Sequence, residues 1–386
     1  MSQESTKAMI AEVFSDIAQG IKSGQFKKKV RIGLTILGSE HGVDEMIKAA
    51  RLAKMKYDDF EIVLIGQEVE GFESVVVESA EEGHKRMTTM LEAGEIDGCV
   101  TQHFDFPIGV STVGRVITPG LGRELIIATT TGTTSTNRVE GMVKNAISGI
   151  AVAKACGIEN PTVGILNLDG ARQVERILND IKGNGYEINF SDSLRADGGA
   201  VMRGNDLLAG TPDVMVCDSL TGNLLIKIFS SFTTGGNYEI SGSGYGPGIG
   251  EDYDKVVNIV SRASGAPLIA EALRYCATCT QNKVLDIARK EYKAANEAGL
   301  EAAIKKVTEK NNKSVAEEEV TAPPKKVVTY SIAGVDILEL ENACKCLWKQ
   351  NIYSESGMGC TGPIILVAEE DGETAKKVLI DSEFIA

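Results

Sequence analysis

The stretch Val30-Arg-Ile-Gly-Leu-Thr-Ile-Leu37 decides the fold class, because it is a short apolar run that ends at the loop Gly38-Ser-Glu-His-Gly42. Apolar residues then recur at helical spacing over residues 43–56, and a second apolar run, 60–65, stops at Gly66. A strand, a helix and a strand in this order predict a β-α-β unit with parallel strands. The chain therefore starts as an α/β protein.

The same alternation continues along most of the chain. Further strands are predicted at 98–101, 125–130, 162–167, 214–217 and 364–367, and further helices at 80–93, 138–156, 171–182 and 335–348. This order predicts mainly parallel sheets with helices on both faces, a Rossmann-like α/β/α arrangement in two lobes around a cleft. Ligands of such sheets bind at the carboxyl ends of the strands, in the loops that lead into the next helix.

Composition shifts divide the chain. Residues 1–28 predict an amphipathic N-terminal helix, and residues 285–327 a charged helix followed by a linker that contains Pro323-Pro324. We expect residues 29–150 together with 328–386 to form a first α/β lobe, and residues 151–284 a second.

Charge and apolar patterning limit the partners. The formal net charge is −14, which disfavours nucleic acid and anionic lipid as partners. We find no apolar run of membrane-spanning length and no signal-peptide pattern, so a cytoplasmic protein is predicted. Most of the eight cysteines are then expected to be buried thiols.

Gly357-Met-Gly-Cys-Thr-Gly-Pro363 places one cysteine among three glycines. A thiolate is a good acyl carrier, and glycines leave backbone N–H groups free to stabilise an oxyanion. The alternative is a small apolar residue in a tight turn. The candidate catalytic residues here are Cys360, Gly359 and Thr361.

The Thr-rich loop, residues 129–138, follows a predicted strand and opens a helix. Hydroxyls, glycine and arginine at a helix N-terminus suit a phosphate dianion. The alternative is an ordinary helix cap with a solvated arginine. The candidate phosphate ligands in this loop are Thr133, Thr134, Ser135, Asn137 and Arg138.

A second loop, residues 217–223, holds the same position between a strand and a helix. Thr221 and Asn223 offer donors to a phosphate, and Lys227 lies one turn further on. Again the alternative is a capped helix start, with Asp218 as the cap.

Other polar segments are less suited to chemistry. Residues 241–252 place glycine at every second position but lack a dinucleotide or P-loop spacing, so a mobile or partner-facing loop is predicted. With three histidines in the chain, zinc and Ser-His-Asp mechanisms are disfavoured, and His41 is a possible base or a hydrogen-bonded loop residue. Cys276-Ala-Thr-Cys279 has metal-pair spacing, but no second pair follows, and no metal is predicted.

Several motifs together resemble the phosphate:acyl-carrier-protein acyltransferase family of phospholipid synthesis. Residues 160–167 are similar to its N-P-x-V-G-L-L-N strand, and residues 214–227 to its V-V-V-C-D-G-F-x-G-N-x-x-L-K segment. Residues 37–42 and 358–367 match two of its loops less closely. The likeness extends from about residue 29 to 369 and implies that family's fold.

Cys360 and the glycine-alternating segment 241–252 depart from that family. With the Thr-rich loop, they are similar to the α subunits of component C of glycine/sarcosine/betaine reductase. This resemblance implies an acetyl thioester on the enzyme and phosphorolysis to acetyl phosphate. It also implies a β-subunit partner similar to β-ketoacyl synthase III, and work with the selenoprotein component A.

The resulting hypothesis is an acyltransferase that needs inorganic phosphate as substrate and no cofactor. Phosphate, held by Arg138 with Asn223 or Lys227 nearby, attacks an acetyl group on Cys360. Two alternatives stay open: a phosphate:acyl-carrier-protein acyltransferase without a covalent cysteine, and a non-catalytic scaffold subunit. A homo- or hetero-oligomer is expected.

Overall fold

The computed structural model describes most of the chain. It covers residues 14–15, 17–18, 21, 29–196, 198–315, 320–336, 339–359, 362–382 and 384–385. Most of the predicted N-terminal helix, with Cys360 and Thr361, lies outside the described residues.

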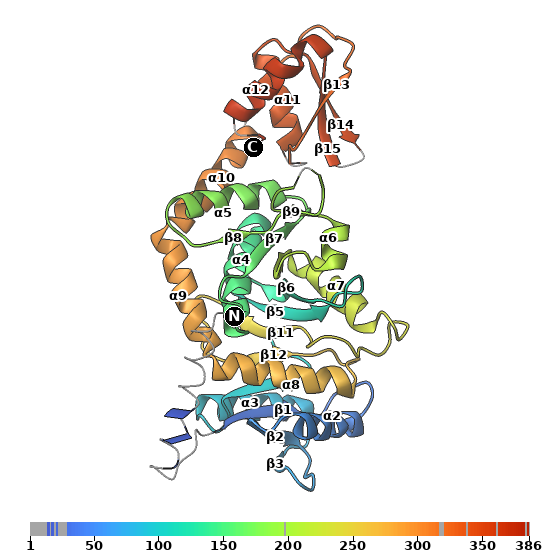
Figure 1. The fold of residues 1–386 in the computed structure, drawn as a ribbon, viewed down its shortest axis with the longest axis vertical. Helices are drawn as coiled ribbons and strands as arrows, with labels where there is room; N and C mark the ends of the chain where they lie inside the picture. The colour runs from blue at the N-terminus through green and yellow to red at the C-terminus, as the bar shows by residue number, and fades with distance from the viewer. Residues whose placement is uncertain are drawn as a thin grey trace.

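Within the described ranges, one 12-stranded sheet has the order β3-β2-β1-β4-β12-β11-β5-β6-β10-β7-β8, with β9 paired to β7. Figure 1 shows it running through the main body of the molecule. Its strands are β1 (Val30–Thr35), β2 (Phe60–Gly66), β3 (Glu73–Val76), β4 (Gly98–Thr101), β5 (Val110–Ile117), β6 (Glu124–Thr133), β7 (Thr162–Leu166), β8 (Asn189–Phe190), β9 (Val201–Met202), β10 (Val214–Val216), β11 (Gly246–Ile249) and β12 (Val257–Ile259).

The strand direction reverses in the middle of this sheet. In the first half, β3, β2, β1, β4 and β12 are parallel. Three antiparallel pairings follow, β12 with β11, β11 with β5 and β5 with β6. The second half, β6, β10, β7 and β8, is again parallel. The carboxyl ends of the two halves therefore point to opposite edges of the sheet.

Helices cover both faces, because side chains alternate along each strand. In β6, Ile126 and Ala128 enter one core, and Leu125 and Ile127 enter the other. The first core is closed by α2 (Val43–Lys56), α4 (Arg138–Ala155), α5 (Ala171–Gly183), α8 (Ala266–Gln281), α9 (Val284–Glu297) and α10 (Leu300–Val315). The second is closed by α3 (Ala80–Glu92), α6 (Gly204–Ala209) and α7 (Ser219–Ser231). The predicted fold class is confirmed.

Residues 330–381 form a separate C-terminal unit with its own core. Its sheet has the order β13-β15-β14, and Figure 1 shows it at one end of the molecule, beyond α5 and α10. Its elements are β13 (Tyr330–Ala333), α11 (Leu340–Lys349), β14 (Ser354–Gly359), β15 (Gly362–Val367), a 3₁₀ turn (Glu369–Asp371) and α12 (Gly372–Asp381). An ion pair between Arg176 of α5 and Glu339 joins the unit to the second half.

These boundaries differ from the predicted division. The strands of residues 328–386 pair with one another and not with the lobe predicted from residues 29–150. Residues 284–297 form a helix that buries Val284, Ala288, Tyr292 and Ala295, largely within the segment predicted to be a charged helix and a linker. This helix is amphipathic, with a charged outer face, and its composition alone does not show that the opposite face is buried.

The prediction of a loop at residues 241–252 is wrong for its centre, which is the buried strand β11. A Cβ on Gly246 would lie 1.7 Å from the Val113 carbonyl oxygen, and one on Gly248 would lie 2.3 Å from the Phe106 ring. The glycines thus let β11 approach its neighbours closely. None of the described helices is long and apolar enough to span a membrane.

We predict that Gly246→Ala lowers the free energy of unfolding by more than about 3 kcal/mol, because the methyl group meets backbone that cannot move aside. Gly71 is the matched control, since its φ of 87° resembles the 82° of Gly246 but no atom lies within 4 Å of its Cβ position. Gly71→Ala should cost roughly 1–2 kcal/mol. Urea unfolding measures both, and equal losses would contradict the packing argument.

Candidate functional site

A cavity of about 460 Å³ opens at the carboxyl ends of β6 and β10. It is lined by residues from two segments, within 129–145 and 218–221. The structure thus brings together the Thr-rich loop and the loop that follows β10, which are about 80 residues apart in sequence. Five predicted phosphate ligands line the cavity: Thr133, Thr134, Ser135, Arg138 and Thr221.

Two helices begin at this cavity. Asn137 caps α4 by accepting from the backbone N–H of Glu140 at 3.0 Å, and Asp218 caps α7 by accepting from Thr221 N–H at 2.9 Å. First-turn N–H groups have no partner within their own helix, and the helix dipole places partial positive charge there. Two N-termini at one cavity therefore favour an anionic ligand.

Arg138 is held between two carboxylates at this edge. Its Nη2 lies 2.7 Å from Asp218 Oδ2, and its Nη1 lies 3.6 Å from Asp169 Oδ2. Burial acts to raise the pKa of Asp218, but hydrogen bonds from Thr221 and Arg138 outweigh it and hold this pKa below its ordinary value. Arg138 is thus positioned across the ends of three strands, β6, β10 and β7, and its charge is largely balanced.

A buried network of hydrogen bonds stabilises the Thr-rich loop. The Thr134 hydroxyl lies 2.6 Å from both Asn145 Oδ1 and Ser111 Oγ. Asn145 Nδ2 donates to the Cys217 carbonyl oxygen at 3.0 Å, which ties α4 to the end of β10. Thr134 therefore serves the geometry of the loop, and the hydroxyls of Thr133 and Ser135 are better placed for a ligand.

Close backbone contact fixes the start of α7. A Cβ on Gly222 would lie 1.7 Å from the Thr129 carbonyl oxygen, so glycine is required for this helix to approach β6. The V-C-D-S-L-T-G-N motif thus has a packing reason for its glycine as well as a cap at Asp218.

Three predicted phosphate ligands do not line the cavity. Asn137 is used as the cap of α4, and Asn223 Nδ2 donates to the Thr130 carbonyl oxygen at 3.2 Å. Lys227 Nζ lies 3.7 Å from Glu239 Oε1, a carboxylate that is 2% exposed. Local spacing placed these side chains near the loop, but α7 turns Asn223 toward β6 and Lys227 toward Glu239.

His41 also lies away from the cavity. Its Nε2 is 3.1 Å from the Ala263 carbonyl oxygen, and its ring meets Tyr238 edge-on at 5.0 Å. It follows β1, whose carboxyl end points to the opposite edge of the sheet from that of β6. In this geometry His41 is a hydrogen-bonded loop residue, the second of the two interpretations considered for it.

Sequence reasoning missed two polar residues of this edge, Asp169 and Asn145. Asp169 lies two residues after the end of the predicted strand 162–167, so the same strand-to-helix rule would have found it. Asn145 lies within a helical pattern and carried no such signal.

Cys360 and Thr361 lie outside the described residues, between Gly359, which ends β14, and Gly362, which begins β15. Cys276 and Cys279 are buried in α8, and burial raises the pKa of the Cys276 thiol to about 12. The part of the chain that the structure describes contains no group of three His, Cys, Asp or Glu side chains placed to hold a metal ion.

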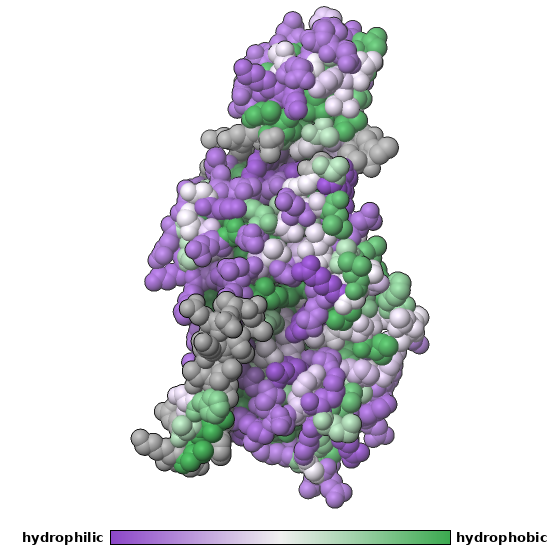
Figure 2. Space-filling model, viewed as in Figure 1, coloured by the Kyte–Doolittle hydropathy of each residue, from purple (hydrophilic) through white to green (hydrophobic). Residues whose placement is uncertain are grey.

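An apolar stripe on α7 starts at the rim of the cavity. Leu220, which lines the cavity, is 82% exposed, and it is followed at four-residue intervals by Leu224, Ile228 and Phe232. Figure 2 shows apolar side chains gathered on the flank where Figure 1 has α6 and α7. The open side of the cavity is therefore bordered by an apolar surface.

The model of a protein family described as fatty acid synthesis protein matches residues 30–366. The chain belongs to this family. A relative from Peptoclostridium acidaminophilum, named glycine/sarcosine/betaine reductase complex component C subunit alpha, is 57% identical over 381 residues, 98% of this chain and 99% of that protein. The resemblance predicted from the motifs is confirmed.

More distant relatives of this chain carry other names. A phosphate acyltransferase of Thermotoga petrophila is 28% identical over 237 residues, 52% of this chain and 67% of that protein. A solved branched-chain phosphotransacylase from Enterococcus faecalis V583 is 14% identical with a TM-score of 0.45, over 65% of this chain and 99% of that one. The sequence relationships support an acyltransferase-like role.

We predict that Asp218→Asn lowers the free energy of unfolding by about 1 kcal/mol at neutral pH, because asparagine keeps the cap but loses the ion pair with Arg138. The folded pKa of Asp218 is depressed, so its contribution is complete above its ordinary pKa of 3.8 and is lost as the pH falls through the lower folded value. Urea unfolding of both proteins at pH 7 and at about pH 3 measures the difference.

The control is the same substitution in an Arg138→Gln background, where the pH-dependent difference should become smaller but persist, because the Thr221 N–H still donates to Asp218. A difference between wild type and Asp218→Asn that stays constant across the pH range would show that the charge of Asp218 is not what stabilises this edge.

Proposed function

We propose that the chain is an acyltransferase subunit that releases an enzyme-bound acetyl thioester as acetyl phosphate, within a glycine/sarcosine/betaine reductase complex. The observation that carries the proposal is the cavity at which the N-termini of α4 and α7 converge with Arg138. The second support is the 57% identity over nearly the whole length of a component C α subunit.

The proposed reaction starts with an acetyl group on the Cys360 sulfur. A phosphate oxygen attacks the thioester carbonyl carbon and forms a tetrahedral oxyanion. The C–S bond then breaks, the electron pair returns to sulfur, and acetyl phosphate leaves as the thiolate takes up a proton. Backbone N–H groups near Gly359 would stabilise the oxyanion, and the approach of Cys360 to the cavity is part of the proposal.

Phosphate binding in this proposal rests on donors and not on net charge. Asp218 and Asp169 already balance Arg138, so the attraction for an anion comes from the two helix N-termini and from hydroxyls such as Thr133 and Ser135. A guanidinium has five N–H donors, so Arg138 can keep its contact with Asp218 and still donate to phosphate. The carboxylates thereby orient the arginine for its ligand.

The proposed partners follow the relative's name and the resemblance. We place the chain with a β subunit of component C and with the selenoprotein component A, in the cytoplasm. Inorganic phosphate is the proposed substrate, and no cofactor or metal is needed for the step described.

A second candidate is direct acyl transfer between phosphate and an acyl carrier, without a covalent cysteine. Met142 and Leu220 place apolar surface in a cavity larger than a phosphate, which would suit a longer acyl chain. The phosphate acyltransferase relative favours the same alternative.

We predict that incubation with acetyl phosphate places a hydroxylamine-labile acetyl group on Cys360, detected by intact-protein and peptide mass spectrometry. The group should be absent from Cys360→Ala and present in Cys346→Ala, a half-buried thiol of α11 in the same C-terminal unit. Phosphate-dependent acyl exchange without any adduct would favour the second candidate. No adduct and no exchange, even with the β subunit present, would leave the chain as a scaffold.

We predict that Arg138→Gln reduces kcat/KM for phosphate at least about tenfold, because it removes a charge-assisted donor from the cavity. Arg123→Gln is the matched control, since Arg123 pairs with Asp213 at the other end of β10, also at 2.7 Å. Acyl exchange is measured at varied phosphate concentration. Equal losses in the two variants would mean that Arg138 acts only through fold stability.

A further inference from the structure

Two cysteines from distant parts of the chain meet where α4 and α8 end. Cys156 is the residue at which α4 ends, and Cys279 lies in the last turn of α8. Their thiols lie close enough to interact, and Cys156 is also close to the Arg115 guanidinium. Cys156 is half-buried, whereas Cys279 is fully buried.

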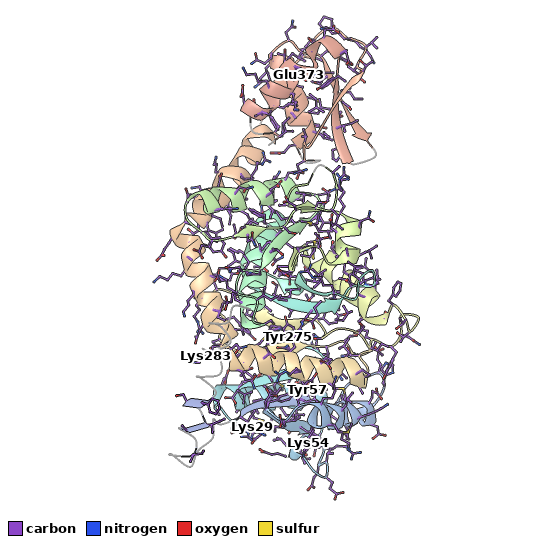
Figure 3. All side chains as sticks on the ribbon, viewed as in Figure 1. Lys29, Lys54, Tyr57, Tyr275, Lys283 and Glu373 are labelled. Atoms are coloured by element: carbon purple, nitrogen blue, oxygen red, sulfur yellow. The ribbon has the colours of Figure 1, made fainter. Side chains whose placement is uncertain are left out.

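The contacts of α8 bring its last turn to the end of α4, where Cys156 lies. Tyr275, Cys279 and Asn282 follow one another at spacings that put them on one side of the helix. Asn282 Nδ2 donates to the Ala155 carbonyl oxygen at 2.8 Å, next to Cys156 in the chain. Tyr275, labelled in Figure 3, extends from α8 to β5, where its hydroxyl donates to the Val113 carbonyl oxygen at 2.9 Å.

Arg115 is the charged residue near this pair of cysteines. It extends from β5 with its guanidinium carbon 5.8 Å from the centre of the Tyr275 ring, and it pairs with Glu124. A positive charge beside a partly exposed thiol, with a second thiol in reach, is the environment of a reactive cysteine and its resolving partner.

We propose that Cys156 and Cys279 form a redox site, in which oxidation by a hydroperoxide links them in a reversible disulfide. The Cys276-Ala-Thr-Cys279 spacing drew attention to a different pair, but the fold gives Cys279 its partner from α4. This site is independent of the proposed acyl transfer and of Cys360.

The pKa values of the two thiols shift in opposite directions, as such a reaction requires. A hydrogen bond from Cys279, with the charge of Arg115, lowers the pKa of Cys156 despite its burial. The same hydrogen bond, with complete burial, raises the pKa of Cys279. Cys156 is also the more exposed of the two thiols and lies near Arg115, so it is the attacking sulfur, and Cys279 is the sulfur that resolves the product.

The step balances with the hydroperoxide as oxidant. With hydrogen peroxide as the oxidant, the Cys156 thiolate attacks one peroxide oxygen, the O–O bond breaks, and a sulfenic acid forms on sulfur. The other oxygen leaves as water. Cys279 then attacks this sulfur, the S–O bond breaks, and a second water carries away the oxygen and the remaining proton. Two thiols are oxidised to one disulfide, and both peroxide oxygens are reduced to water.

The disulfide would cross-link the two halves of the sheet. α8 packs against α2 and the first half, and α4 packs against β6 and β10 of the second. A link between positions 156 and 279 closes a long loop of chain, so it should restrict the unfolded state and raise the melting temperature.

The test treats the full-length chain with one equivalent of hydrogen peroxide, alkylates the remaining thiols and analyses the peptides by mass spectrometry. A linked Cys156–Cys279 peptide pair that dithiothreitol separates is expected. The link should be absent from Cys156→Ser and from Cys279→Ser, and unchanged in Cys276→Ser, which removes the other cysteine of the Cys276-Ala-Thr-Cys279 pair.

The melting temperature of oxidised and reduced wild type gives a readout that needs no variant, and the oxidised protein should melt higher. A Cys276–Cys279 link in place of the expected one would overturn the proposal. So would oxidation of Cys156 to sulfinic acid without a link, or thiols that all remain free after treatment.

Discussion

The contact that the rest of the structure depends on is the approach of β11 to β5, with Gly246 against the Val113 carbonyl oxygen. Only a strand without side chains on that side can come this close. Because β11 is antiparallel to both of its neighbours, it joins the first parallel half-sheet to β5, and the antiparallel pairing of β5 with β6 then reverses the direction of the second half. The edge on which each loop opens follows from these pairings.

The candidate site also depends on which strands are neighbours. The site lies within the second half-sheet, where β6 and β10 are neighbours whose loops both open helices at one edge. The cavity gathers two N-termini and one arginine already bound to two carboxylates. An overall negative protein thus offers an anion a local environment set by backbone dipoles, which act over the first turn of a helix and are little affected by distant charges.

Much of the fold could be predicted from the sequence, because strands such as β4 and helices such as α2 have apolar patterns with clear ends. β11 could not, since its residues carry no apolar alternation and its reason to be a strand is a close contact with β5. The Thr-rich loop and Arg138 were found by the rule for strand ends, which depends on local order alone. His41 obeyed the same rule but belongs to the other edge, and that depends on the order of strands in the sheet.

The order of strands also bears on how the chain is made. β12 and α8, residues 257–281, complete the first half of the sheet beside β4 and α2, yet they are synthesised after the whole second half. A nascent chain that has reached residue 231 has both parallel units, but the first still has an unpaired edge at β4 and an uncovered face on α2. Truncation before residue 257 would therefore not yield an independent N-terminal domain, because the second half is inserted into the first.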